Sequence, residues 1–221
     1  MRSVLVLRPE PGASVTVEQA RERGLHAVAS PLFEVQPVAW KAPDAAGFNG
    51  LLLTSANALR YAGGQLQKFR ALPAYVVGEA TGEAARDAGF DVAASGDDGV
   101  DRLLGSIEPD LKLLHLCGQH HREAAAARQK VTAIPVYAAK AVDDPGLDAA
   151  EGAVALIYSP RSGRRFAELV ANRASIAIAA ISGAAADAVG AGGERIETAQ
   201  EPTSNALLAL AARLCNIPDP K

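Results

Sequence analysis

Several short apolar runs of this chain end at small polar residues, glycine or arginine, and then continue as helix-like segments. In α/β proteins such a strand-to-helix turn presents unpaired backbone N–H groups to a ligand, and the first turn of a helix attracts anions. Backbone donors flanked by small residues favour a ligand rich in carboxylates or phosphates. The candidate binding residues are Arg8, Thr54, Ser55, Ala56, Asn57, Gly78, Gly118, Ser159, Arg161, Ser162, Ser182, Gly183 and Ala184.

A purely structural role is the alternative for most of these residues. Ser55 and Ser159 are good N-caps, and such a cap contributes about 1 kcal/mol to a helix. Gly78 and Gly183 are suited to tight turns. Cys117, at the end of an apolar run, is expected to be a small buried hydrophobe. Both interpretations stay open at this level.

Neither a metal centre nor a nucleotide site is indicated. His120 and His121 are adjacent, so their side chains point apart, and no cysteine or carboxylate spacing accompanies them. The Gly-x-Gly-x-x-Gly and P-loop patterns are absent. We therefore expect no bound metal, and a nucleotide-dependent transferase is disfavoured.

Composition narrows the class of protein further. The net charge of −3 over 221 residues argues against a nucleic-acid partner. Two cysteines, Cys117 and Cys215, are too few for a disulfide framework, which favours a reducing cytosol. No stretch is suited to span a membrane, and the apolar residues 4–7 are too few for a signal peptide.

A repeat organises the elements that must position the candidate residues. Ser55 and Ser159 stand 104 residues apart, and Leu103-Leu104 and Leu207-Leu208 keep the same offset. Pro31 and Pro135 also keep it, outside the matched block. One ungapped offset over more than fifty residues indicates an internal duplication.

Strand-like and helix-like segments alternate along the chain. We expect strands at 4–7, 26–29, 51–54, 75–77, 91–94, 111–116 and 131–137, with helices at 11–23, 56–70, 79–88, 100–107 and 121–130. The second copy repeats the pattern from 153 to about 214. Such alternation predicts an α/β fold with parallel sheets and right-handed crossovers.

The repeat predicts two lobes, one of them discontinuous. Each copy supplies three strands and needs a further strand–helix–strand unit, which for the second copy can only be the N-terminal segment. We expect one domain at 1–33 and 142–221, an inserted domain at 39–136, and hinge strands at 33–38 and 137–142 that pair antiparallel. If the lobes face one another, the strand-end turns line a cleft, with Tyr137 at its floor; simple packing is the alternative role for Tyr137.

Five segments together resemble the uroporphyrinogen-III synthase family. They are Val6-Leu7-Arg8-Pro9, residues 53–58 (LTSANA), Val77-Gly78-Glu79-Ala80-Thr81, Pro135-Val136-Tyr137 and Glu201-Pro202-Thr203. The resemblance covers nearly the whole chain. It implies two flavodoxin-like or Rossmann-like lobes and a monomeric, cytosolic lyase without cofactor. Such enzymes convert hydroxymethylbilane, a linear tetrapyrrole with eight carboxylates, into uroporphyrinogen III, losing water and inverting ring D.

The resemblance also implies roles for individual residues. Tyr137 matches the hinge tyrosine, which is expected to assist departure of the hydroxyl as a hydrogen-bond donor. Thr81 matches the threonine of the Gly-x-x-Thr turn and is the second candidate catalytic residue. Thr54, Ser55 and Ser159 match turns that lie near the substrate carboxylates.

The sequence departs from the family pattern in two places. Ala184-Ala185 stands where the second lobe usually carries threonines, and Cys117-Gly118 stands where an arginine or similar polar residue is often expected. The missing threonines favour an alternative, a two-lobed binding or regulatory module that has kept the fold and lost catalysis.

Overall fold

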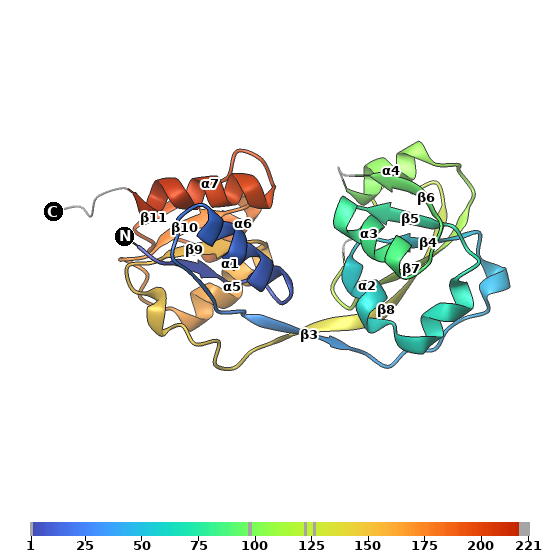
Figure 1. Cartoon of the computed structure of the whole chain (residues 1–221), viewed down its shortest axis with the longest axis horizontal. Coiled ribbons are helices and arrows are strands. Elements are labelled where there is room, and N and C mark those ends of the chain that lie inside the picture. Colours follow the sequence, from blue (N-terminus) through green and yellow to red (C-terminus); the bar gives the residue numbers. More distant parts are fainter. Residues whose placement is uncertain (1, 97–98, 122, 126, 217–221) are drawn as a thin grey trace. The chain divides into compact units, whose positions relative to one another are not determined.

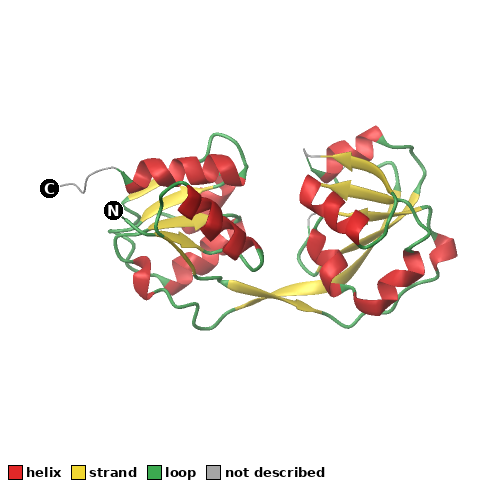
Figure 2. Cartoon of the chain, viewed as in Figure 1, coloured by secondary structure: helices red, strands yellow, loops and turns green. Residues whose placement is uncertain are grey.

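The computed structural model describes residues 2–96, 99–121, 123–125 and 127–216. They form two compact units, one from the described residues of Met1–Glu34 and Ala141–Lys221, the other from those of Val35–Lys140. Each unit is an α/β domain whose sheet is covered by helices (Figures 1 and 2). The α/β fold class with two parallel sheets, inferred from the alternating pattern, is confirmed.

The sheet of the first unit joins the two ends of the chain. Its strand order is β11-β10-β9-β1-β2, and every neighbouring pair is parallel. The strands are β1 (Val4–Val6), β2 (Ala27–Ala29), β9 (Val154–Ile157), β10 (Ala177–Ala180) and β11 (Arg195–Thr198). Val4 pairs with both Ala27 and Val154, so β1 lies between β2 and β9 and joins the N-terminal strands to those of the C-terminal half.

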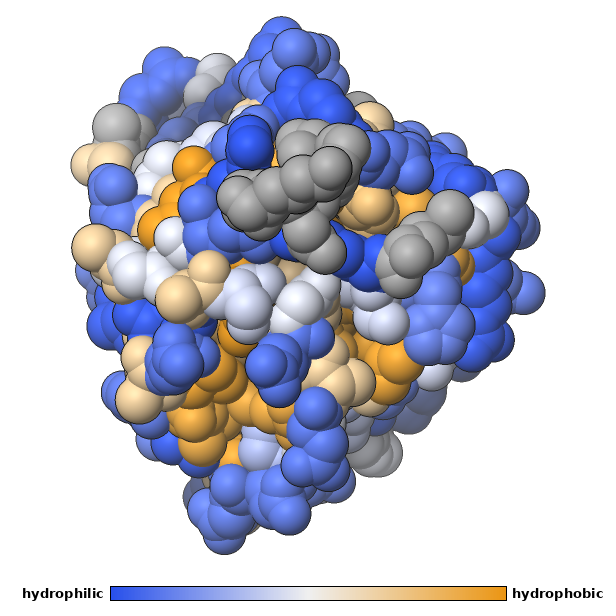
Figure 3. All heavy atoms as spheres, turned by 90° about the vertical axis from the view of Figure 1, so that its left-hand side faces the viewer, coloured by the Kyte–Doolittle hydropathy of each residue, from blue (hydrophilic) through white to orange (hydrophobic). Residues whose placement is uncertain are grey.

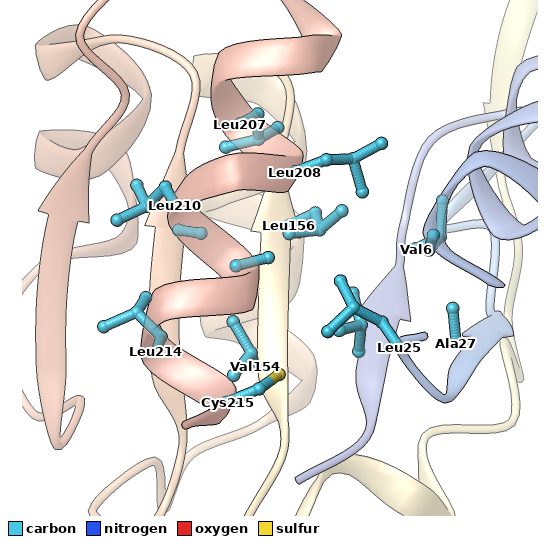
Figure 4. Close-up of a cluster of buried hydrophobic side chains, with 14 of the residues drawn as sticks. Val6, Leu25, Ala27, Val154, Leu156, Leu207, Leu208, Leu210, Leu214 and Cys215 are labelled. Carbon is cyan, nitrogen blue, oxygen red and sulfur yellow. The ribbon is translucent and has the colours of Figure 1, made fainter. Parts of the chain in front are cut away.

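Apolar side chains bury both faces of this sheet. On one face Val6, Val154 and Leu156 pack against leucines of α7 (Ser204–Cys215) and residues of α1 (Gly12–Glu22) (Figure 4). Because side chains alternate along a strand, Leu5 and Ala155 face the opposite side, and they are fully buried as well. Because these strands are buried on both faces, their sequences are continuous apolar runs.

Two further helices of this unit pack closely on each other. They are α5 (Pro160–Leu169) and α6 (Gly183–Val189), and η3 (Asp148–Ala150) is a short 3-10 helix before β9. A Cβ atom at Gly163 would lie 2.9 Å from the carbonyl oxygen of Ala185. Gly163 of α5 and the alanines of α6 therefore allow the two helices to approach more closely than larger side chains would.

The second unit repeats the strand order of the first. Its order is β3-β8-β7-β4-β5-β6, in which β4 to β8 are parallel, and β4 occupies the place that β9 has in the other sheet. The strands are β3 (Phe33–Pro37), β4 (Gly50–Leu53), β5 (Ala74–Val77), β6 (Val92–Gly96), β7 (Lys112–Gly118) and β8 (Lys130–Ala141). β4 and β9 begin and end 104 residues apart.

The helices of this unit are shorter than the sequence pattern suggested. They are α2 (Ala56–Tyr61), α3 (Glu79–Asp87) and α4 (Val100–Ser106), with 3-10 helices η1 (Ala45–Gly47) and η2 (Gly63–Phe69). The single helix expected at 56–70 is wrong, because α2 ends at Tyr61 and Gly63 takes a φ of +66°, which breaks α-helical geometry.

The helix expected at 121–130 is also wrong. The described residues between β7 and β8 are not helical. Their alanines have high helix propensity but no large apolar side chain that could bury a helix face, and packing supplies most helical stability. Instead, Gln129 Nε2 donates to the carbonyls of Leu104 (3.0 Å) and Glu108 (2.8 Å), and Ala125 N donates to Asp101 Oδ1 (2.8 Å).

β3 and β8 form the antiparallel pair that connects the units. Val142 N donates to Leu32 O at 3.0 Å, and Val38 N donates to Val136 O at 3.1 Å. As one segment advances from Leu32 to Val38, its hydrogen-bond partners in the other segment run backward from Val142 to Val136. Strands paired in this order are antiparallel.

No helix within the described part of the chain is long and apolar enough to cross a membrane. Seen from the left-hand side of Figure 1, hydrophobic residues reach the surface at several places between hydrophilic ones (Figure 3). Among the described residues, Val15 (51%) and Ile196 (36%) are the exposed large hydrophobic side chains. Apolar atoms normally contribute more than half of a folded protein's surface, so these exposures need no special explanation.

Candidate active site

Tyr137 lies in β8 beside the last residue of β7, where the two strands end their parallel pairing. The register shifts between Cys117 and Gly118, so that Gly118 pairs with Tyr137. Such an irregularity re-aims a side chain at a strand end. A Cβ atom at Gly118 would lie 2.7 Å from Cε2 of Tyr137 and 3.1 Å from its hydroxyl oxygen. The Tyr137 ring therefore covers Gly118, and only glycine leaves room for it.

Two polar groups lie near the Tyr137 hydroxyl and affect its pKa. Burial raises the pKa of Tyr137, while hydrogen bonds from the Ser55 side chain and the Gly118 backbone act in the opposite direction. Ser55 also caps α2, accepting a hydrogen bond from Asn57 N at 3.2 Å. Because the raised pKa keeps the phenol protonated at neutral pH, its O–H remains a donor for a further partner.

Thr54 pairs with a histidine that the sequence analysis did not single out. Thr54 Oγ1 lies 3.0 Å from His115 Nε2, and His115 is 3% exposed. Burial, followed by the charge of His121, lowers the pKa of His115 to about 4, so the imidazole is neutral at pH 7. The sequence signal for His115 is a polar residue inside an otherwise apolar strand. The sequence pattern of β7 was interpreted only as that of a buried strand.

Gly78 and Thr81 lie at the next strand end, after β5. Gly78 has a φ of +83°, which favours glycine, and its carbonyl accepts a hydrogen bond from Thr81 N at 3.1 Å. Thr81 is buried in the first turn of α3. The tight-turn role of Gly78 is confirmed, and a role for Thr81 toward a ligand stays a prediction.

In the first unit, the residues after β9 form a reciprocal cap. Ser159 Oγ accepts from Ser162 N at 3.1 Å, and Ser162 Oγ accepts from Ser159 N at 3.0 Å. The N-cap interpretation of Ser159 is confirmed, as is that of Ser55. The guanidinium of Arg161 stacks on the Phe33 ring, 4.3 Å from its centroid, and burial lowers the pKa of Arg161.

The remaining residues of this unit follow β1 and β10. The Arg8 guanidinium lies 4.5 Å from the centroid of the Tyr158 ring, and its NH1 donates to Ser204 Oγ at 3.4 Å. Ser182 caps α6 by accepting from Ala185 N at 3.3 Å, and Gly183 and Ala184 are exposed.

The structure thus sorts the candidate residues into two groups, one in each unit. In the second unit Thr54, Ser55 and Gly118, at the ends of β4 and β7, lie close to Tyr137 in β8. Ala56 and Asn57 belong to the first turn of α2. In the first unit the residues follow β1, β9 and β10. Every candidate except Tyr137 stands at or just beyond the carboxyl end of a parallel strand, where ligands of open α/β sheets bind.

Comparisons with known proteins identify the family of this chain and structures with a similar fold. The family model "Uroporphyrinogen-III synthase HemD" matches residues 14–209. A relative from Chlorobaculum parvum, "Uroporphyrinogen-III synthase", is 33% identical over 92 residues, a stretch that covers 38% of this chain and 37% of the relative. The match thus spans well under half of the relative's length.

Two solved structures have a similar fold. Uroporphyrinogen-III synthetase from Helicobacter pylori has a TM-score of 0.68 at 18% identity, covering 97% of this chain and 100% of that one. A mutant uroporphyrinogen III synthase from Thermus thermophilus has a TM-score of 0.53 at 16% identity, with 96% and 98% covered.

Proposed function

The chain belongs to the uroporphyrinogen-III synthase HemD family, whose model matches residues 14–209, and on that premise we propose that it cyclises hydroxymethylbilane to uroporphyrinogen III. The reaction removes water and inverts ring D. Loss of the hydroxyl gives an azafulvene, which the substituted carbon of ring D attacks; the resulting spiro intermediate fragments and recloses with that ring reversed. We propose that no cofactor takes part.

The hydroxyl of Tyr137 is the observation that best supports this chemistry. A leaving hydroxide needs a hydrogen-bond donor, and general-acid assistance contributes typically 10²–10⁴-fold to such a step. The Tyr137 hydroxyl lies near Ser55 and Gly118, and burial raises its pKa, so the phenol is protonated at neutral pH. Its O–H can therefore donate to the departing group.

The substrate's carboxylates fit the strand-end turns. The capped starts of the helices after β4 and β9 present backbone N–H groups, and Arg8 and Arg161 add positive charge. Both guanidinium groups stack on aromatic rings, which limits their motion before a ligand arrives. We propose that these turns bind carboxylates of the substrate, and that Thr81 contributes from the turn after β5.

The main task of such a site is conformational control. Hydroxymethylbilane can also close without inversion, which gives uroporphyrinogen I, so the enzyme must hold ring D with its substituted carbon toward the azafulvene. We further propose a monomeric cytosolic enzyme; the two cysteines, Cys117 and Cys215, are buried free thiols, which suits a reducing compartment.

The test is to supply hydroxymethylbilane and to separate the isomers after oxidation. We expect isomer III to predominate. The alternative, a catalytically silent two-lobed binding module, is favoured by Ala184-Ala185, where threonines are usual. Isomer I in the proportion of an enzyme-free control would support that alternative and overturn the proposed activity.

A further inference from the structure

A second group of chemically active side chains contacts Thr54 and Gly118 through hydrogen bonds. β7 carries His115 and Cys117 on one face of the sheet, since residues two apart in a strand share a face. His121, three residues after β7, completes the group. One ligand atom from each of His115, Cys117 and His121 lies within 4.8 Å of the others.

The hydrogen bond of His121 leaves one of its nitrogens free. Nδ1 lies 3.1 Å from the carbonyl oxygen of Gly118. A carbonyl can only accept, so Nδ1 carries the proton and Nε2 keeps its lone pair. Nε2 is buried and has no hydrogen-bond partner among the described residues. A histidine that donates one N–H to a backbone carbonyl and offers the other nitrogen is the usual arrangement of a metal ligand.

His115 is oriented in a similar way. Its Nε2 lies 3.0 Å from Thr54 Oγ1, and a hydroxyl can accept the Nε2–H proton, which leaves a lone pair on Nδ1. The rings of His115 and His121 meet edge to face, with centroids 5.4 Å apart. Thr54 therefore stands where an outer partner of a ligating histidine would stand.

A cavity of about 290 Å³ opens beside the two histidines and provides access. Its lining includes His115, His121, Glu123 and Gln129. Gln129 is 6% exposed; its Nε2 binds two carbonyls, whereas its Oε1 is buried without a partner among the described residues. Two unpaired acceptors at one cavity are unusual in a folded protein, and a metal ion with a bound water would satisfy both.

From this geometry we propose that His115, Cys117 and His121 bind one Zn²⁺ ion. Two imidazoles and one thiolate suit zinc, whose tetrahedral sites use nitrogen and sulfur ligands. A water or the Glu123 carboxylate takes the fourth position from the cavity. Binding converts the Cys117 thiol into a zinc-bound thiolate and releases its proton to solvent.

The site needs only a small closure. Zinc–ligand bonds of about 2.0–2.3 Å place tetrahedral ligand atoms roughly 3.5 Å apart, so atoms within 4.8 Å of one another need to approach by at most about 1.3 Å. His121 lies on the connection to β8, where a helix was expected and none forms among the described residues. A bound ion would link this connection to β7. The proposed zinc site does not depend on the proposed catalytic activity.

The test uses the full chain, freed of metal with a chelator and then titrated with Zn²⁺ and Co²⁺. We expect one Zn²⁺ per chain, and with Co²⁺ a thiolate-to-cobalt charge-transfer band and strong tetrahedral ligand-field bands. Cys117→Ala should abolish the charge-transfer band and weaken zinc binding at least about 100-fold, because loss of an outer partner alone typically costs 10–100-fold. His121→Gln should weaken zinc binding at least about tenfold.

Matched controls are available for both ligands. Cys215→Ala removes the other buried thiol, and His120→Gln changes the neighbouring histidine; both should bind zinc as the wild type does. Circular dichroism of each metal-free variant checks its fold, and His121→Gln changes a half-buried residue outside the strands, so it tests the site even if Cys117→Ala unfolds. Absence of stoichiometric zinc from the wild type, a cobalt spectrum without the thiolate band, or equal affinities for His121→Gln and His120→Gln would overturn the proposal.

Discussion

The ring of Tyr137 covers the backbone of Gly118 so closely that a Cβ atom at residue 118 would come within 2.7 Å of Cε2. The same glycine lies against the Tyr137 hydroxyl, and its carbonyl accepts a hydrogen bond from His121 Nδ1. One residue without a side chain thus contacts both the proposed acid and one of the proposed zinc ligands.

Replacing this glycine should displace the tyrosine ring. We expect Gly118→Ala to lower kcat/KM about 100-fold, since a misplacement of about 1 Å can have that effect, and to destabilise the fold by about 1–3 kcal/mol through overpacking. Gly105→Ala in α4, where an added Cβ meets no atom within 4 Å, is the control and should leave turnover unchanged. Steady-state kinetics and urea unfolding measure both effects, and a fully active Gly118→Ala would contradict this account of the site.

Removing only the hydroxyl of Tyr137 tests its role as a donor. Tyr137→Phe keeps the ring and should slow turnover by about 10²-fold, the lower end of general-acid effects, while the protein stays folded. Tyr61→Phe is the matched control, because its ring centroid lies 6.3 Å from that of Tyr137. Wild-type rates for Tyr137→Phe would remove this hydroxyl from the mechanism.

Two of the three arginines on α5 provide a test of carboxylate binding. Arg161→Gln should raise KM about tenfold with little change in kcat, because a hydrogen bond to a charged group is worth about 1.5–3 kcal/mol. Arg164→Gln, which changes an exposed residue of the same helix, should leave KM unchanged. The same KM for both variants would exclude Arg161 from the binding site.

Burial of His115 predicts that stability depends on pH. Its pKa is lowered to about 4, so between about pH 6.5 and pH 4 the unfolded chain binds a proton that the folded chain does not. Stability is therefore complete above pH 6.5 and is lost as the pH falls. In chelator-treated protein this group should contribute a loss of about 2 kcal/mol between pH 7.5 and pH 5.

Urea unfolding at the two pH values measures that loss. His115→Gln should show a smaller decline than the wild type, and His26→Gln, which changes an exposed histidine, should decline as the wild type does. An unchanged decline in His115→Gln would mean that other groups cause the acid sensitivity.

Much of the fold could be predicted because its signals are local or repeated. Buried strands such as β4 and β9 stand out as apolar runs, and their common offset of 104 residues predicts equivalent places in two sheets. Serine caps are read from one turn of sequence, so Ser55 and Ser159 were interpretable without coordinates. The prediction of a helix at 121–130 was wrong because helix propensity alone does not show whether a segment can pack against the rest of the protein.

The site was less accessible to sequence reasoning. The hydrogen bond between Thr54 and His115 joins residues 61 positions apart, and the strand brings His115 and Cys117 to one face only once its register is known. The contact of Gly118 with Tyr137 depends on an irregularity in strand pairing. These relationships arise from tertiary structure, and no local pattern of residues encodes them.

The isomer composition of the product, measured as the enzyme concentration is raised against a fixed amount of hydroxymethylbilane, tests the central claim most directly. Spontaneous closure gives uroporphyrinogen I at a rate independent of the protein, so the account predicts that the share of uroporphyrinogen III rises with enzyme until it dominates. A share of isomer III that stays at the enzyme-free level at every protein concentration would contradict it.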